Sequence, residues 1–294
     1  MASWSHFLGD VTRTQFLKDL YAEIQDDNVF NGAAALAYYW MLAIFPALIF
    51  LLSLLPFLPI PNLEDAIMDF MGEALPQEAA GLFSNVLSQT VESSSGGLLS
   101  FGLLFTLWSA SAGLYAIMQQ LNITYDIKEG RSFVKARGVS ILLTLGFLLM
   151  IIGAFALIVF GGTLQEWLAS FVGRNPVLLA FFASLRWIII IALLLLGFSM
   201  IYYFGPNVEQ KFKFITPGSV LGVALLVAAS LGFSFYVSNF GNYAATYGSL
   251  GAVIILLLWL YLAGFVILVG SEINALLEHY NPEGKQKGDK FERA

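Results

Sequence analysis

The sequence contains no cysteine, only two histidines (His6 and His279), and only 12% charged residues. Without cysteine, disulfides and thiolate chemistry are excluded, and two histidines argue against a His-rich zinc or iron site. Soluble domains carry about 25% charged residues, so the low charge excludes a single soluble core. An isoelectric point near 4.9 argues against non-specific binding of nucleic acid, which needs basic patches that neutralise phosphates.

Long apolar runs dominate what the sequence does contain. The 294 residues are 58% hydrophobic with a mean hydropathy of +0.77. The runs are about twenty residues long, enough to cross a hydrocarbon core of about 30 Å. Each run must be helical, because unsatisfied backbone groups in lipid are costly. The sequence therefore predicts an all-α membrane protein, a single polytopic domain over residues 1–294. Its six transmembrane helices are placed at residues 33–58, 98–121, 139–162, 180–203, 216–238 and 249–275.

Three flanking segments complete the predicted organisation. Residues 1–31 carry apolar side chains at near-helical spacing in a polar context, which favours a cytoplasmic amphipathic helix over a signal peptide. This helix would lie on the membrane surface or pack on the bundle. Residues 59–97 contain six acidic residues and no lysine or arginine, and we interpret them as an external helical hairpin, either a lid or an acidic gate. Residues 276–294 form a cytoplasmic tail.

The positions of lysine and arginine indicate the orientation. Basic residues precede the first span and follow the second, fourth and sixth spans. The opposite side has Arg174, with Arg186 still to be placed. Because basic residues concentrate in cytoplasmic loops, the pattern predicts that both termini are cytoplasmic.

Polar residues predicted near the inner face form the first candidate site. They are Asn31, Tyr38, Tyr39, Asn122, Tyr125, Asp126 and Arg137. One interpretation is a polar vestibule whose bases suit anionic headgroups, each base contributing about 1 kcal/mol near the surface. The other is an ordinary positively charged inner loop.

Glu272 and Asn274 lie near the end of the last span. Ionisable residues within spans are candidate functional residues. Glu272 is interpreted either as a helix-end residue paired with Arg131 or Arg137, or as a proton or headgroup contact at the inner mouth.

Small and hydroxylated residues within the spans give a further hypothesis. Ser109 and Ser111 suit close helix packing or a narrow polar seam. A serine hydrolase would need a histidine or lysine base, and the spans contain neither. Pro46, Pro206 and Pro217 are interpreted as helix punctuation or as hinges.

Arg186 interrupts the apolar run of the fourth span, and its depth depends on where that span begins. If the span begins near Leu178, Arg186 is roughly 12 Å deep. If it begins at Ser184, the side chain reaches the outer headgroups. The alternatives are such snorkelling, pairing with Glu64, Asp69 or Glu166, and contact with a buried substrate.

Several stretches together resemble one family. They are NGAAALAYYWMLAIFP (31–46), LWSASAG (107–113), LNITYD (121–126), YYFGP (202–206), PG (217–218), YGSLGA (247–252), WLY (259–261) and GSEIN (270–274). This ordered set is similar to the YihY/BrkB family of bacterial inner-membrane proteins, formerly labelled ribonuclease BN. The resemblance implies a role in envelope integrity or serum resistance, and in some members movement of lipids or lipopolysaccharide precursors.

These observations lead to a function hypothesis. We expect an inner-membrane protein that handles or translocates an amphiphilic envelope molecule, such as a phospholipid or a lipid-linked or lipopolysaccharide precursor, without hydrolysing nucleotide. The alternatives are an envelope scaffold that binds other envelope proteins, and a small-solute channel. Membrane lipids are the expected partners, and no cofactor, metal or nucleic acid is expected. Ribonuclease activity is not expected, because the acidic cluster of Glu23, Asp26 and Asp27 has no histidine beside it in the sequence.

Overall fold

The computed structural model describes residues 11–54, 98–172, 176–208, 213–240 and 250–280. All regular structure within these residues is α-helical. The helices are α2 (Arg13–Asp26), α3 (Val29–Leu54), α6 (Leu98–Thr124), α7 (Phe133–Val172), α8 (Pro176–Phe204), α9 (Pro217–Phe240) and α11 (Leu250–His279). The predicted external hairpin at 59–97 and residues 281–294 of the predicted tail lie outside the described residues.

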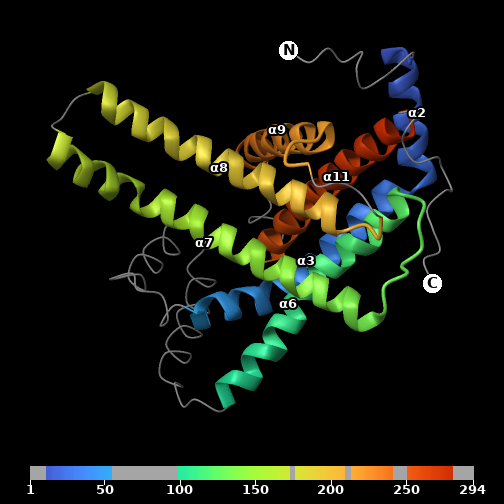
Figure 1. Cartoon of the computed structure of the whole chain (residues 1–294), viewed down its shortest axis with the longest axis horizontal. Coiled ribbons are helices and arrows are strands. Elements are labelled where there is room, and N and C mark those ends of the chain that lie inside the picture. The colour runs from blue at the N-terminus through green and yellow to red at the C-terminus, as the bar shows by residue number, and fades with distance from the viewer. Residues whose placement is uncertain (1–10, 55–97, 173–175, 209–212, 241–249, 281–294) are drawn as a thin grey trace.

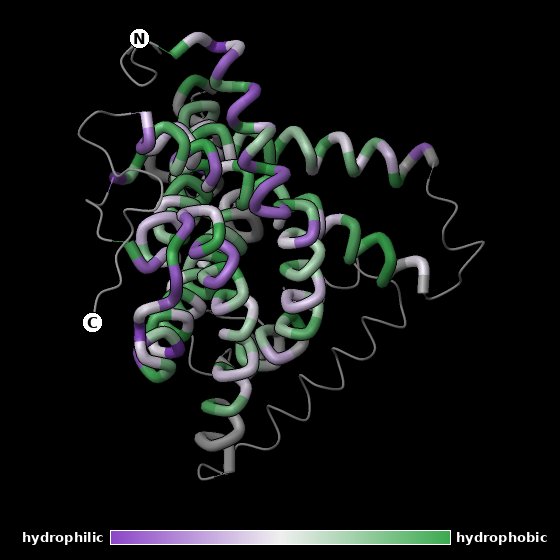
Figure 2. The backbone as a smooth tube through the Cα atoms, turned by 90° about the vertical axis from the view of Figure 1, so that its right-hand side faces the viewer, coloured by the Kyte–Doolittle hydropathy of each residue, from purple (hydrophilic) through white to green (hydrophobic). Residues whose placement is uncertain are grey.

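Four helices contain windows that are long and apolar enough to cross a membrane. These windows are Phe133–Leu157, Ala180–Phe204, Pro217–Val237 and Val253–His279, and a shorter apolar helix covers Val29–Ile44. In Figure 2 the long helices are coloured mostly as hydrophobic, whereas the helix next to the N-terminus is largely hydrophilic. The prediction of an all-helical membrane protein is therefore confirmed.

The helices pack side by side in a closed order. α11 contacts α3, α3 contacts α6, α6 contacts α7 and α7 contacts α8; α8 contacts α9, which returns to α11. The main core lies where α3, α6 and α11 meet, around the fully buried side chains of Leu36, Leu121 and Leu268. The helices of this ring therefore come from both halves of the sequence.

The helix ends differ from the predicted spans most clearly in α7 and α8. α7 has 40 residues and is therefore about 60 Å long, twice the thickness of a hydrocarbon core. The C-terminal half of α7 runs beside α8, away from the rest of the bundle (Figure 1). α8 begins at Pro176, and proline is favoured at the first helical position because its missing N–H has no partner there.

α2 packs on the bundle, which was one of the two predicted arrangements. Thr12 caps its first turn by accepting a hydrogen bond from the backbone N–H of Gln15 (3.2 Å). Phe16 is buried and its ring lies 6.3 Å from that of Tyr280, just after α11. Asn28, with φ of 50°, separates α2 from α3, and asparagine tolerates this left-handed conformation.

Candidate functional site

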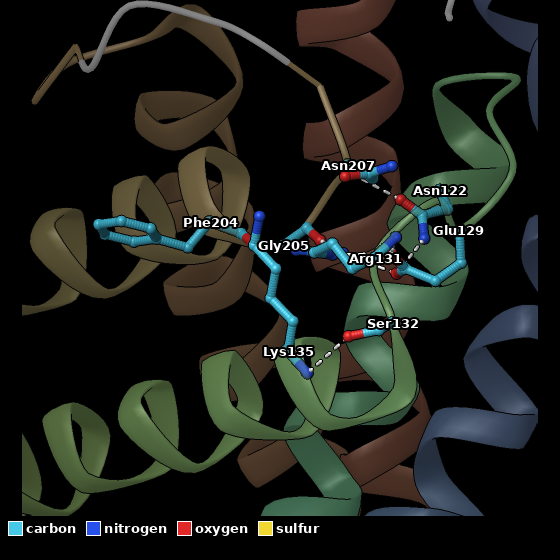
Figure 3. A network of polar contacts seen from close by, with 8 residues as sticks. All are labelled: Asn122, Glu129, Arg131, Ser132, Lys135, Phe204, Gly205 and Asn207. Carbon is cyan, nitrogen blue, oxygen red and sulfur yellow. Dashed lines mark hydrogen bonds and ion pairs between the residues drawn. The ribbon is translucent and has the colours of Figure 1, made fainter. Parts of the chain in front are cut away.

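A polar network joins the end of α6, the α6–α7 connection and the end of α8 (Figure 3). Arg131 donates from Nε to Glu129 Oε1 (2.7 Å) and from Nη2 to Glu129 Oε2 (2.8 Å). It also donates to the carbonyl oxygens of Phe204 (3.1 Å) and Gly205 (2.8 Å). The last carbonyl groups of a helix have no partner within the helix, so Arg131 supplies hydrogen-bond donors at the end of α8.

Asn122 completes this network. Its side-chain amide donates to Glu129 Oε2 (2.9 Å), and its side-chain oxygen accepts from the backbone N–H of Asn207 (2.8 Å). Burial alone would raise the pKa of Glu129, but the hydrogen bonds from Arg131 and Asn122 hold it below its ordinary value. Pro206 lies between Gly205, which accepts from Arg131, and Asn207, which donates to Asn122. The geometry gives Asn122 a structural role in addition to its candidate functional one.

Tyr125 and Asp126 follow α6 directly. Asp126 has φ of 51°, and its N–H donates to the Ile123 carbonyl (2.7 Å) while the N–H of Ile127 donates to the Asn122 carbonyl (2.9 Å). This pair of bonds is a Schellman motif, so Asp126 ends the helix and its side chain is exposed. Tyr125 is buried, and burial, with the charges of Glu278 and Glu272, raises its pKa.

Glu272 is buried where α11 meets the turn between α2 and α3. Its side chain is hydrogen-bonded to Asp27 and to Thr124, and its Oε1 has no hydrogen-bond partner. The predicted pairing with Arg131 or Arg137 is wrong: Arg131 pairs with Glu129, and Arg137 donates to the Trp108 carbonyl. A polar cavity of about 310 Å³ adjoins this region and is lined by Asp26, Asp27, Asn28, Asn31, Gly32, Gln120 and Ile123.

Arg137 is a buried cation at the start of α7. Its guanidinium lies 4.4 Å from the ring centroid of Trp108 and 5.6 Å from that of Tyr115. Nη2 donates to the Trp108 carbonyl (2.6 Å), whereas Nε has no partner and no acidic side chain of the described residues pairs with it. The rings partly compensate the charge.

Hydroxyl groups extend from Arg137 along the same face of α7. The Ser140 hydroxyl donates to the Arg137 carbonyl (2.8 Å), and the Thr144 hydroxyl donates to the Ser140 carbonyl (2.7 Å). Residues 137, 140 and 144 share one helix face because they are three and four positions apart. Thr144 belongs to the wall of a second, larger cavity.

This second cavity has a volume of about 450 Å³ and lies inside the ring of helices. Its walls come from α3, α6, α7, α8, α9 and α11, and they are almost entirely apolar, with Trp40, Phe147, Phe198 and Trp259 as the largest side chains. Its size is within the range of about 300–1,000 Å³ typical of ligand pockets. The Thr144 hydroxyl already donates a hydrogen bond to its own helix, so the cavity wall has few polar groups that could bind water.

Arg186 lies on α8 and packs against α7. A Cβ added at Gly161 would lie 2.7 Å from Arg186 Cδ, so the absence of a side chain there makes room for the arginine. The guanidinium is 5.7 Å from the ring centroid of Trp187, and Nε is buried without a partner. Its predicted partners Glu64, Asp69 and Glu166 are outside the described side chains.

Asn274 and Pro217 organise the start of α9. The side-chain oxygen of Asn274 accepts from the Gly218 N–H (2.8 Å), and its amide donates to the Thr216 hydroxyl (3.1 Å). Pro217 is the first residue of α9, where proline is favoured. Pro46, in contrast, lies inside α3, where it removes one backbone hydrogen bond.

The remaining candidates do not converge on one vestibule. Tyr38 and Tyr39 are exposed on the outside of α3 and contact each other. Asn31 lines the polar cavity. Ser111 is fully buried and donates to the Trp108 carbonyl (2.7 Å), which fits the packing interpretation. Ser109 is half-buried.

Neither Thr124 nor Gln120 was identified as a site residue from the sequence. Asp27 was also not identified as the partner of Glu272. The sequence shows Asp27 only as a member of the acidic cluster with Glu23 and Asp26, 245 positions before Glu272. No periodicity links two positions so far apart. The one available signal was the isolated acidic residue in the last apolar run, which requires some partner.

The fold and these buried polar sites define a polytopic α-helical membrane protein with a partly open apolar cavity between its helices. The chain belongs to the virulence factor BrkB family, whose pattern it matches over residues 20–294. It is 40% identical over 262 residues to the ribonuclease-like protein YfkH of Bacillus subtilis (strain 168), covering 89% of this chain and 94% of that protein. It is 31% identical over 303 residues to the UPF0761 membrane protein xcc-b100_3490 of Xanthomonas campestris pv. campestris (strain B100), covering 99% of this chain and 68% of that protein. No solved structure matches.

Proposed function

We propose that the chain is an inner-membrane protein that binds an amphiphilic envelope molecule and moves it across the bilayer without hydrolysing nucleotide. A phospholipid or a lipid-linked or lipopolysaccharide precursor is the substrate class. The observation that carries the proposal is the apolar cavity of about 450 Å³ within the ring of helices. In a membrane protein the molecules best suited to such a cavity are acyl chains, because apolar cavities stay free of water.

Arg137 supplies the second part of the argument. An amphiphile needs a polar contact as well as an apolar one, and the partner-free Nε of this buried guanidinium lies at one end of the Ser140–Thr144 ladder that reaches the cavity. Arginine suits phosphate because its planar donors match phosphate oxygens. This arrangement favours an anionic or zwitterionic phosphate-bearing headgroup.

The proposed topology has six transmembrane helices, α3, α6, α7, α8, α9 and α11, with both termini in the cytoplasm. α3 and α6 have 26 and 27 residues, which is long enough to cross. Because the chain has no cysteine, single cysteines can be introduced directly. A membrane-impermeant maleimide should label Lys135→Cys only from the cytoplasm and Val177→Cys only from outside. The reverse pattern would refute the orientation.

A reconstitution assay tests transport. The protein is placed in vesicles containing a fluorescent phospholipid, and flipping is followed by chemical quenching of the outer leaflet. Ala154→Phe narrows the cavity from α7 and should slow flipping at least tenfold. The matched control is Leu149→Phe on the exposed side of the same helix, which should retain the wild-type rate. No acceleration of flipping by wild-type protein, together with no photo-crosslinking of lipid in the cavity, would refute transport and favour a scaffold.

Arg186 is a second proposed contact for the anionic group. If it binds an anion through its charge, Arg186→Ala should slow flipping far more than Arg186→Lys. A wild-type rate in the alanine variant would remove Arg186 from the pathway.

The ribonuclease-like name of YfkH is not carried over to this chain. Metal-assisted cleavage of a phosphodiester needs carboxylates or histidines clustered around a metal. Among the described residues there is no group of three or more histidine, aspartate or glutamate side chains that could hold one.

A further inference from the structure

The carboxyl group of Glu272 is buried inside the protein. Its side chain is 1% exposed, and Oε1 has no hydrogen-bond partner. No lysine or arginine of the described residues forms an ion pair with it. An isolated buried carboxylate is very costly, so the protein must neutralise this group in another way.

The contact with Asp27 indicates how. The two carboxyl groups are hydrogen-bonded side chain to side chain. An ionised carboxylate can only accept hydrogen bonds, so a bond between two carboxyl groups requires that one of them carries a proton. Two carboxylates this close cannot both be ionised at low cost, and sharing one proton is the usual solution.

The surrounding groups strengthen this requirement. Glu23 faces the pair from α2, and the hydroxyl of Thr124 contacts Glu272 from the end of α6. The charges of Glu278 and Glu272 both raise the pKa of Tyr125. His279 lies two helical turns beyond Glu272 on α11. The acidic residue Glu23 makes a second negative charge at the pair less favourable.

A route for the proton is present beside the pair. Asp27 lines the polar cavity of about 310 Å³ together with Asn28, Asn31 and Gln120. Most residues that line the cavity are polar, and the cavity is partly open and large enough for water. Glu272 itself is enclosed, and it reaches the wall of this cavity through Asp27.

We propose that Asp27 and Glu272 form a proton-binding site that holds one shared proton and locks the α2–α3 turn against α11. With the proton bound, the carboxyl–carboxylate hydrogen bond joins the two segments. When the proton leaves through the polar cavity, two adjacent negative charges repel and the turn separates from α11. The site gives the protein a means of responding to pH or to a proton gradient, and this inference does not depend on the proposed lipid transport.

Difference infrared spectroscopy of the full-length protein in nanodiscs tests the proposal directly. At neutral pH the wild-type protein should show the C=O stretch of a buried protonated carboxyl group, shifted in D₂O and lost at alkaline pH. Glu272→Gln mimics the protonated side chain and can still donate to Asp27, so it should fold and lose this band. Asp27→Asn, which keeps a partner for Glu272, should shift or remove the band. The control Asp126→Asn changes an exposed acid at the left-handed end of α6 and should leave the band intact.

A stability measurement gives an independent readout. When the folded protein retains one proton more than the unfolded chain, the unfolding equilibrium constant changes by about tenfold per pH unit. The wild type should therefore lose stability as the pH rises until the shared proton is lost. Glu272→Gln should lack this dependence.

Three results would overturn the proposal. The first is the absence of a protonated-carboxyl band from the wild type at neutral pH. The second is persistence of the unshifted band in both Glu272→Gln and Asp27→Asn. The third is recovery of wild-type stability at alkaline pH on addition of sodium ions, which would identify a bound cation in place of the proton. Failure of the flipping assay would leave these measurements unaffected, so the two ideas can fail separately.

Discussion

Replacing Arg131 with alanine removes four hydrogen bonds, two to Glu129 within the α6–α7 connection and two that join this connection to the end of α8. Two of them satisfy the carbonyl groups of Phe204 and Gly205, and leaving such groups without a partner costs about 1–3 kcal/mol. The ion pair with Glu129 adds less than about 1 kcal/mol, because water can reach the Glu129 carboxylate, which is 25% exposed. We expect Arg131→Ala to lower the free energy of unfolding by about 2–4 kcal/mol.

The assay is reversible unfolding in mixed micelles, followed by circular dichroism. Lys135→Ala is the matched control, because it removes an exposed positive charge close to Arg131 on the chain. Surface substitutions of this kind change stability by less than about 0.5 kcal/mol. If the two variants were equally stable, the closure of α8 by Arg131 would not be important for stability.

Glu129 adds a pH dependence with a definite sign. Its pKa is lowered in the folded protein by the hydrogen bonds from Arg131 and Asn122, against the effect of burial. A lowered folded pKa contributes stability above the ordinary value of 4.5 that is lost as the pH falls through the folded pKa. Wild-type stability should therefore decline in acid, and Arg131→Ala should decline less. Equal acid sensitivity of the two proteins would contradict this assignment.

Two further predictions concern helix contacts. Gly218→Ala would place a methyl group against the carbonyl oxygen of Gly270 and should destabilise the α9–α11 contact by about 1–3 kcal/mol. Gly153→Ala in α7 meets no atom within 4 Å and should be neutral or stabilising by about 0.5–1 kcal/mol; equal melting temperatures for these variants would refute the close approach. Tyr280→Phe removes the hydrogen bond to Asp19 and should cost about 1 kcal/mol. Burial and this hydrogen bond raise the pKa of Tyr280, so wild-type stability should fall as the pH rises above 10. The same alkaline profile in Tyr280→Phe would contradict the assignment.

Apolar run length predicted four of the six spans, because the length of an apolar helix is also what allows it to cross a hydrocarbon core. It predicted the helix ends poorly, as α7 illustrates. The predicted third span ends at Gly162, yet the helix continues to Val172. Glycine permits a helix to end but does not require it, and here Gly161 makes room for Arg186. The end of a membrane-crossing window and the end of a helix are therefore separate predictions.

Local chemistry in the sequence was informative where both partners lie close together along the chain. Pro217 at a helix start follows a rule of one or two positions. Arg131 and Glu129 are only two positions apart in the sequence. This short separation alone favours their pairing over a pair of Arg131 with Glu272. The conditions for such contacts are set before the helices assemble.

The partner of Glu272 illustrates the opposite case. An acidic residue in an apolar run must find a proton, a cation or a base, and the sequence offered bases in the nearby loop. The structure instead places Asp27 beside it, because Asn28 adopts the left-handed conformation that ends α2 and turns the chain into α3. A base would have made Glu272 a fixed ion pair, insensitive to pH over the physiological range. A second carboxyl group makes its charge conditional on a proton, and this difference is what makes Glu272 the strongest candidate for a switch in the described part of the chain.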